Sequence, residues 1–266
     1  MYEFKYQRPA SLDEAVKAFA AAEDGKYLAG GMTLIATMKQ RLAQPSDLID
    51  ISTIAELAGI RREGENLVIG AMARHAEVAS CVEVRSAIPA LAALAGGIGD
   101  PQVRNRGTLG GSIANADPAA DYPAAVVGLG ATVQTNTRSI AGDDFFGGLF
   151  ETRLEEEEII TAVSFPIPQK AAYAKFPNPA SRYAVVGVMV VSGSDGVRVA
   201  VTGAGASVFR VAAMEEALTE NFAPQAVADV RIPEDELNAD IHASAEYRAH
   251  LVTVMAKRAV AAANGG

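Results

Sequence analysis

Helical and extended hydrophobic patterns alternate at the start of the chain. Ser11-Leu12-Asp13-Glu14 forms a capping box, in which the serine and glutamate side chains accept hydrogen bonds from backbone amides at a helix start. The alanine-rich stretch that follows predicts a helix ending near Gly25, and residues 26–29 predict a short strand leading into Gly30-Gly31. Apolar residues at helical spacing over 34–42 predict the next helix.

The following segments predict short strands and further helices. Leu48–Ile51 reads as a strand, and two more strands near 59–61 and 67–70 flank Glu63-Gly64-Glu65-Asn66, a sequence typical of a hairpin turn. Helices are expected from near His75 and over about 88–94.

The stretch from Gly96 to Gly111 is rich in glycine and poor in helix formers. Glycine permits positive φ and close backbone approach. This stretch therefore predicts a loop whose backbone lies close to another part of the protein or to a ligand. Strands are expected over 131–135 and 159–167, the second ending among prolines that place a domain boundary near residue 168.

The C-terminal part predicts a smaller α+β unit. Residues 184–192 and 197–202 alternate like neighbouring antiparallel strands around the turn at 193–196. Helical patterns follow over about 211–220, 224–229 and 244–263.

Composition excludes several classes of function. The formal net charge is −9, and such a surface repels phosphate backbones, so no nucleic-acid partner is expected. No apolar run approaches the ~18 residues that a membrane span requires. The first five residues lack the apolar core of a secretory signal, so we expect the protein in the cytoplasm.

Cysteine and histidine usage argues against metal chemistry. Cys81 is the only cysteine, so the chain holds no internal disulfide, cysteine zinc site or iron–sulfur cluster. We interpret Cys81 as an ordinary half-buried residue rather than a catalytic thiol. The histidines at 75, 242 and 250 are scattered, and we expect no metal site.

Two glycine pairs are candidates for binding an anionic cofactor. The first, Gly30-Gly31, lies at a strand-to-helix junction, where free amides bind phosphate and Thr33 adds a hydroxyl. The second, Gly110-Gly111, lies in a segment with polar residues at Thr108, Ser112, Asn115 and Asp121, and this aspartate is a candidate acceptor for sugar or ribityl hydroxyls. The alternative for both pairs is that tight turns use glycine for steric reasons alone.

Two other motifs are set aside. The segment 197–205 ends a strand in Gly-x-Gly, but Val208 stands where a Rossmann fingerprint has its third glycine. The acidic run Glu155–Glu158 is interpreted as a solvated face that caps the following strand.

The two glycine loops, in this order, resemble the paired phosphate-binding loops of the molybdenum hydroxylase flavin subunits. Met38–Leu42, Gly99–Arg104 and Ile241–Arg248 are similar to the carbon monoxide dehydrogenase medium subunit, so the resemblance covers essentially the whole chain. It implies an α+β fold of the PCMH/VAO type, in which two subdomains grip FAD without covalent attachment. These would span about 1–52 and 53–168, and a smaller α+β C-terminal domain with a short antiparallel sheet would span 169–266.

The resemblance also implies the residues that contact FAD. The loops at 29–35 and 108–112 would bind the pyrophosphate, although Ser112 replaces an asparagine common in the family. No catalytic acid or base is implied in this chain. The implied cofactor-binding residues are Ala29, Gly30, Gly31, Met32, Thr33, Leu34, Ile35, Thr108, Gly110, Gly111, Ser112, Asn115, Asp117, Asp121, Lys175 and Tyr183.

The same resemblance implies partners. A molybdenum-cofactor large subunit would oxidise the substrate, a small [2Fe-2S] subunit would relay electrons to this FAD, and an external acceptor would receive them. Two alternatives remain open: a freestanding FAD-dependent oxidoreductase with its own substrate site, and a non-enzymatic assembly subunit whose glycines serve packing.

Overall fold

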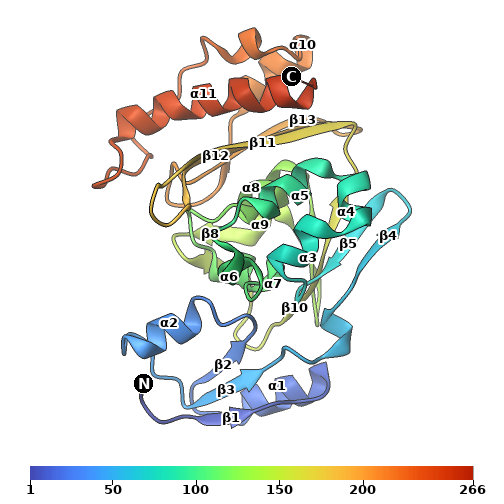
Figure 1. The fold of residues 1–266 in the computed structure, drawn as a ribbon, viewed down its shortest axis with the longest axis vertical. Helices are drawn as coiled ribbons and strands as arrows, with labels where there is room; N and C mark the ends of the chain where they lie inside the picture. Colours follow the sequence, from blue (N-terminus) through green and yellow to red (C-terminus); the bar gives the residue numbers. More distant parts are fainter. Residues whose placement is uncertain (266) are drawn as a thin grey trace.

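The computed structural model describes residues 1–265, which form three regions stacked along the long axis of the molecule (Figure 1). The predicted α+β class is confirmed: successive parts of the chain form separate sheets, and helices pack against them. No helix in the described part of the chain has both the length and the apolarity needed to cross a membrane.

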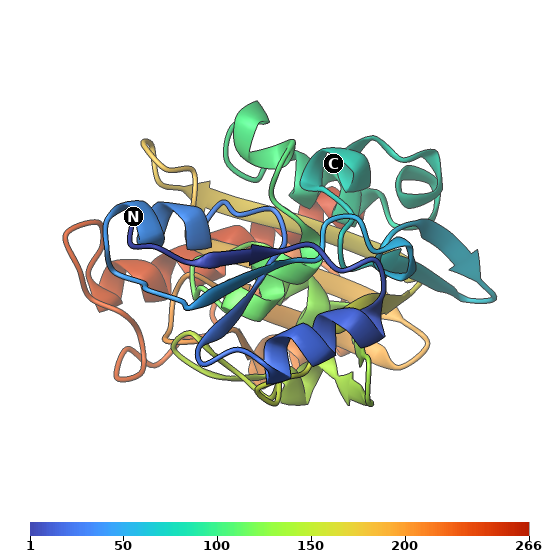
Figure 2. The ribbon, with the colours of Figure 1, turned by 90° about the horizontal axis from the view of Figure 1, so that it is seen from below.

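The N-terminal region is a small parallel sheet with strand order β1-β3-β2. Parallel neighbours need crossover connections, and two helices provide them (Figure 2). Ser11 caps the first helix by accepting a hydrogen bond from the Glu14 amide, as the capping box predicts. The elements are β1 (Lys5–Gln7), α1 (Leu12–Ala20), β2 (Gly25–Leu28), α2 (Leu34–Lys39) and β3 (Asp47–Asp50).

The central region is a five-stranded antiparallel sheet of order β4-β5-β10-β6-β7, covered by short helices. The predicted hairpin is confirmed, with Gly64 at positive φ in its turn. The strands are β4 (Ile60–Glu63), β5 (Asn66–Gly70), β6 (Thr132–Thr135), β7 (Ser139–Ala141), β8 (Phe146–Gly148), β9 (Glu151–Thr152) and β10 (Ile160–Pro166). The helices are η1 (Ala55–Leu57), α3 (His75–Ser80), α4 (Val82–Ala87), α5 (Pro89–Gly96), α6 (Pro101–Arg104), α7 (Leu109–Asn115), α8 (Tyr122–Gly128) and α9 (Gly142–Phe145).

The C-terminal region is a four-stranded antiparallel sheet between two helical layers (Figure 1). Strand β12 is apolar along most of its length because both faces are buried. Met189 and Val191 join the central core, whereas Val188 and Val190 pack toward the C-terminal helices. The elements are β11 (Lys170–Pro177), β12 (Ala184–Gly193), β13 (Gly196–Thr202), β14 (Phe209–Arg210), α10 (Ala212–Glu220), η2 (Pro224–Val227) and α11 (Ala245–Ala263).

The expectation of a loop over residues 96–111 is wrong in part. Asp100 caps the short helix α6 by accepting a hydrogen bond from the Val103 amide, and Gly110-Gly111 lie in the first turn of α7. The domain limits near residues 52 and 168 stay predictions. The packing of β12 against the central core shows that residues beyond 168 help to build that core.

Arg248 on α11 is a buried anchor between the last helix and the sheet. Its Nη1 donates to the carbonyl oxygens of Val185 and Gly203 at 2.7 and 2.8 Å, and its Nη2 donates to the carboxylate of Asp240 at 2.7 Å. The guanidinium therefore bonds one carbonyl near the start of β12 and one just after the end of β13, and it links both to the segment before α11.

Replacing this anchor is expected to destabilise the fold. Arg248→Ala should lower the free energy of unfolding by about 3 kcal/mol, because it leaves buried acceptors without donors. Urea denaturation measures the loss. Arg258→Ala, at an exposed position on the same helix, is the control and should change stability by less than about 0.5 kcal/mol. Equal effects of the two substitutions would contradict the anchoring role.

Candidate cofactor site

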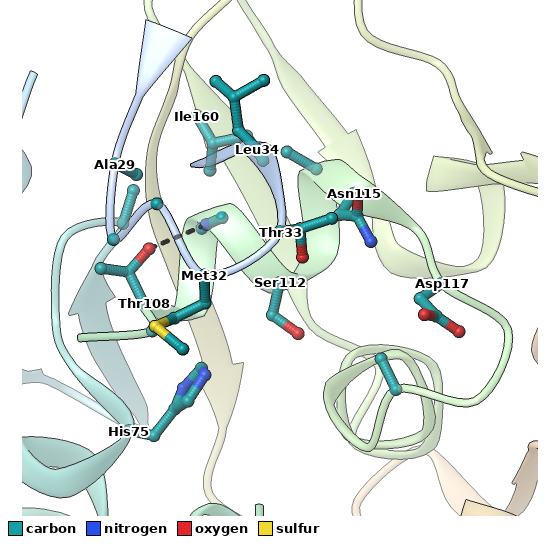
Figure 3. A pocket seen from close by; sticks show the side chains of 18 of the residues that line it. Ala29, Met32, Thr33, Leu34, His75, Thr108, Ser112, Asn115, Asp117 and Ile160 are labelled. Carbon is teal, nitrogen blue, oxygen red and sulfur yellow. Dashed lines mark hydrogen bonds between the residues drawn. The ribbon is translucent and has the colours of Figure 1, made fainter. Parts of the chain in front are cut away.

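A cavity of about 600 Å³ lies where the N-terminal region meets the central region and the loop between β11 and β12 (Figure 3). This volume lies within the range of about 300–1,000 Å³ typical of cofactor and ligand sites. Its walls combine backbone from two glycine loops, a few polar side chains and a larger apolar area.

The loop from Ala29 to Thr33 presents free backbone donors. Within residues 1–265, no hydrogen bond is donated by the backbone N–H groups of Gly30, Gly31, Met32, Thr33 and Leu34. Gly31 has φ +75°, which only glycine adopts readily, and this turn leads the chain from β2 into α2. A run of unbonded amides lining a cavity is suited to hold an anion such as a phosphate.

The second glycine loop contributes differently. The Gly111 amide donates to Thr108 Oγ1, the Gly110 amide donates to the Ala71 carbonyl, and the Ser112 amide donates to the Thr108 carbonyl. These amides therefore serve the fold of α7. What this loop offers the cavity is the side chains of Ser112 and Asn115, one helical turn apart (Figure 3).

Glycines allow both loops to pack closely against neighbouring backbone. A Cβ on Gly30 would overlap the carbonyl oxygen of Arg106, and a Cβ on Gly110 would lie 2.6 Å from that of Ala71. Glycine is therefore required for steric reasons at Gly30 and Gly110. This requirement does not compete with cofactor binding, because close approach is what places the free amides on the cavity wall.

The structure gathers most of the expected site residues. Fourteen of the sixteen line the cavity: Ala29, Gly30, Gly31, Met32, Thr33, Leu34, Thr108, Gly110, Gly111, Ser112, Asn115, Asp117, Asp121 and Tyr183. Tyr183 is 43% exposed, and partial burial raises the pKa of its phenol. Burial also raises the pKa of the Asp117 carboxyl above its usual range.

Ile35 and Lys175 lie outside the cavity wall. Ile35 packs back against the turn at Gly31. The ammonium of Lys175 is used within the protein: it donates to the carbonyls of Gly97 and Arg182 at 2.9 and 3.0 Å and to the carboxylate of Asp121 at 3.0 Å. Contact of these two residues with a cofactor stays a prediction.

Asp121 is more enclosed than its expected role requires. Its carboxylate accepts one hydrogen bond from Tyr173 and one from Lys175, and the residue is buried. Both oxygens thus have partners within the protein. Asp121 thus links Tyr173 and Lys175 beside the cavity. Asn115 and Asp117 are the more accessible polar groups in the cavity wall.

Several lining residues were not expected from the sequence. Apolar side chains from distant segments form much of the wall, among them Met72, Ile98, Val103, Leu154 and Ile160. Their chemistry is that of any core residue, so only the fold distinguishes them. His75 also lines the cavity, although a lone histidine in a sequence gave no indication of it.

The acidic run Glu155–Glu158 is only partly a solvated face. Glu158 is buried, with its side chain 1% exposed, and accepts hydrogen bonds from Arg138 Nε at 2.9 Å, Thr135 Oγ1 at 2.7 Å and Thr137 Oγ1 at 2.9 Å. The Arg138 guanidinium, together with these hydroxyls, lowers the pKa of this carboxyl to about 2. Glu158 fixes the strand ends beside the cavity.

These features fit FAD. The free amides suit a pyrophosphate, Ser112 and Asn115 suit the hydroxyls of a sugar chain, and the apolar wall suits an aromatic ring system. Fold and cavity together define an α+β protein that binds an extended, phosphate-bearing cofactor.

The comparisons with known proteins place the chain in a family. Residues 2–168 match the family model of the FAD binding domain in molybdopterin dehydrogenase. The chain belongs to this family, and its cofactor is FAD.

Relatives match over nearly their full length. The carbon monoxide dehydrogenase medium chain of Hydrogenophaga pseudoflava is 37% identical over 98% of this chain and 96% of that protein. The nicotine 6-hydroxylase medium subunit of Paenarthrobacter nicotinovorans is 35% identical over 96% of this chain and 95% of its own. A solved carbon monoxide dehydrogenase from Hydrogenophaga pseudoflava superposes with a TM-score of 0.93 at 38% identity, covering 99% and 98% of the two chains. The resemblance and the FAD-binding fold expected from the sequence are confirmed.

Enlarging Gly30 should disrupt the site. Gly30→Ala is expected to cost about 1–3 kcal/mol of stability and to reduce the FAD retained after purification at least tenfold, because the Cβ drives the two loops apart. Flavin absorbance per chain measures retention. Gly193→Ala is the matched control, since no described residue approaches its Cβ within 4 Å. Normal FAD content in Gly30→Ala would contradict this account of the loops.

Glu158 makes a pH-dependent contribution to stability. Since its folded pKa of about 2 lies below the unfolded value near 4.5, the contribution is complete above pH 4.5 and is lost as pH falls toward 2. Glu158→Gln should therefore lower the unfolding free energy by about 2–3 kcal/mol at pH 7, with at most half that difference at pH 3. Urea titrations at both pH values test this, with exposed Glu156→Gln as control. A difference independent of pH would refute the assignment.

Proposed function

We propose that this chain is the electron-transferring FAD subunit of a molybdenum hydroxylase complex in the cytoplasm. It takes electrons from the [2Fe-2S] clusters of a small partner subunit and delivers them to an external acceptor, while a molybdenum-bearing large subunit oxidises the substrate. The observation that carries the proposal is the run of five unbonded amides at residues 30–34 on the wall of a cofactor-sized cavity.

The chain's own residues would bind and enclose the cofactor. The amides of the first loop would hold the pyrophosphate, Ser112 and Asn115 would orient the polar chain, and Met32 and Tyr183 would shield the cavity mouth. Bound FAD accepts two electrons or passes them singly, which couples two-electron chemistry to one-electron carriers.

Two observations support partner subunits: the chain has too few cysteines for an iron–sulfur cluster, and its relatives are named as subunits of larger enzymes. An iron–sulfur cluster is held by about four cysteine ligands, and this chain has one cysteine. The relatives are described as medium chains or medium subunits, terms that belong to multi-subunit enzymes. We therefore place the electron relay and the substrate site on separate chains.

Purification of the chain from its native host with its attached partners tests the proposal. We expect about one FAD per chain, by absorbance, together with molybdenum and iron by elemental analysis. FAD without molybdenum and iron would overturn the proposal in favour of a freestanding flavoenzyme. An intact complex without flavin would overturn it in favour of an assembly subunit.

The electron-transfer step has its own test in the same complex. A complex carrying Gly30→Ala should keep its molybdenum and iron but lose FAD, and its turnover with an external acceptor should fall in proportion to the missing FAD. A Gly193→Ala complex is the control. Full turnover in a complex depleted of FAD would show that electrons leave by another route.

A further inference from the structure

The imidazole of His75 is buried beside the cavity without the hydrogen bonds that such a group normally makes. The residue is 4% exposed, and its Nδ1 is sealed from solvent with no hydrogen-bond partner anywhere in residues 1–265. Roughly 90% or more of buried polar groups in proteins are bonded. His75 lines the cavity, and its Nε2 lies next to Gly107, which lines the same cavity. Because Nδ1 is sealed off, Nε2 is the ring nitrogen available to a ligand there.

The backbone holds this ring in place next to the first glycine loop. The His75 amide donates to the Gly107 carbonyl at 3.0 Å, and the Leu109 amide donates to the Ala73 carbonyl at 2.9 Å. A Cβ on Gly107 would lie 2.5 Å from His75 Nε2, so glycine at 107 makes room for the ring. Gly107 also contacts Gly30, which begins the run of free amides. Figure 3 shows His75 at the cavity wall below Met32 and Thr108.

The surroundings determine which nitrogen carries hydrogen. Burial, with a smaller contribution from Arg104, lowers the pKa of His75 to about 4, so the ring is neutral at neutral pH. A neutral imidazole has one N–H and one lone pair. Placing the hydrogen on Nδ1 would bury an N–H without an acceptor, which proteins tolerate less well than an unsatisfied acceptor. The hydrogen therefore belongs on Nε2.

We propose that His75 is a positioning residue that donates a hydrogen bond from Nε2 to the diphosphate of bound FAD, beside the free amides of residues 30–34. The inference rests on the FAD binding proposed above. It adds an uncharged donor to a site in which the other diphosphate donors are backbone groups.

Two substitutions of His75 distinguish the contributions of its two ring nitrogens. His75→Gln keeps an N–H donor near the position of Nε2, whereas His75→Asn keeps one only near Nδ1. In the chain purified with its partners and stripped of flavin, His75→Asn should bind FAD and ADP about tenfold more weakly, the loss expected for one hydrogen bond to a charged acceptor. His75→Gln should stay within about threefold of the unmodified chain. His250→Asn, at an exposed histidine, is the control.

The protonated nitrogen of His75 can also be observed directly in the chain without substitutions. In the chain labelled with ¹⁵N-histidine, which has three histidines, correlation spectra report which ring nitrogen of His75 carries hydrogen. We expect Nε2, with its signal shifting when ADP is added. Comparison with His75→Gln assigns the signal.

Each outcome decides the question. A hydrogen on Nδ1, or unchanged ADP affinity in His75→Asn, overturns the role of His75 while leaving FAD binding intact. Equal losses in the Asn and Gln variants, accompanied by lower melting temperatures, show a structural role and also overturn it. If the unmodified chain binds neither ADP nor FAD, the proposed function fails and this inference fails with it.

Discussion

The close approach of two backbone segments is the constraint on which the cofactor site depends. Gly30 lies against the carbonyl of Arg106, and Gly110 lies against Ala71, so that a methyl group at either position would collide with backbone or Cβ atoms. The first contact joins the N-terminal region to the central region, and the second lies within the central region. With glycine at both positions, the amides of one loop and the polar side chains of the other line a single cavity.

This arrangement divides the work between the two loops. The first loop leaves its amides unbonded, so they remain available to a ligand in the cavity. In the second loop the Gly111 and Ser112 amides bond within the first turn of α7, and the Gly110 amide bonds the Ala71 carbonyl. Packing against the second loop holds the donor-rich first loop in position, which is a common way to prepare a binding site before its ligand arrives.

Much of the fold could be predicted from local signals, and the failures have physical causes. The capping box at Ser11, the hairpin at Gly64 and the alternating strands around 193–196 carry their information within a few residues. Helix α8 was missed because it is buried on all sides, so its sequence has no polar face to reveal a period. Helix α7 was missed because glycines, which disfavour helices, are there required by contacts with distant residues.

The site divides in the same way. The two loops were predictable because the two glycine pairs, in this order, resemble the paired phosphate-binding loops of the family. Lys175 was expected near the flavin, and its contact with a cofactor stays a prediction. Its three hydrogen bonds within the protein could not be predicted, because their partners are distant in the sequence. His75 was passed over because a lone histidine gains meaning only once Gly107 is seen to make room for it.

The C-terminal sheet is part of the site rather than an appendage. The Lys175 ammonium on β11 donates to the Asp121 carboxylate at the start of α8 and to the carbonyls of Gly97 and Arg182. One ammonium therefore connects three segments beside the cavity. A buried ion pair contributes little net stability, because desolvation offsets most of the attraction, yet breaking one is costly. Its value here is geometric. It fixes the position of the β11–β12 loop, and with it Tyr183, relative to the glycine loops on the opposite side of the cavity.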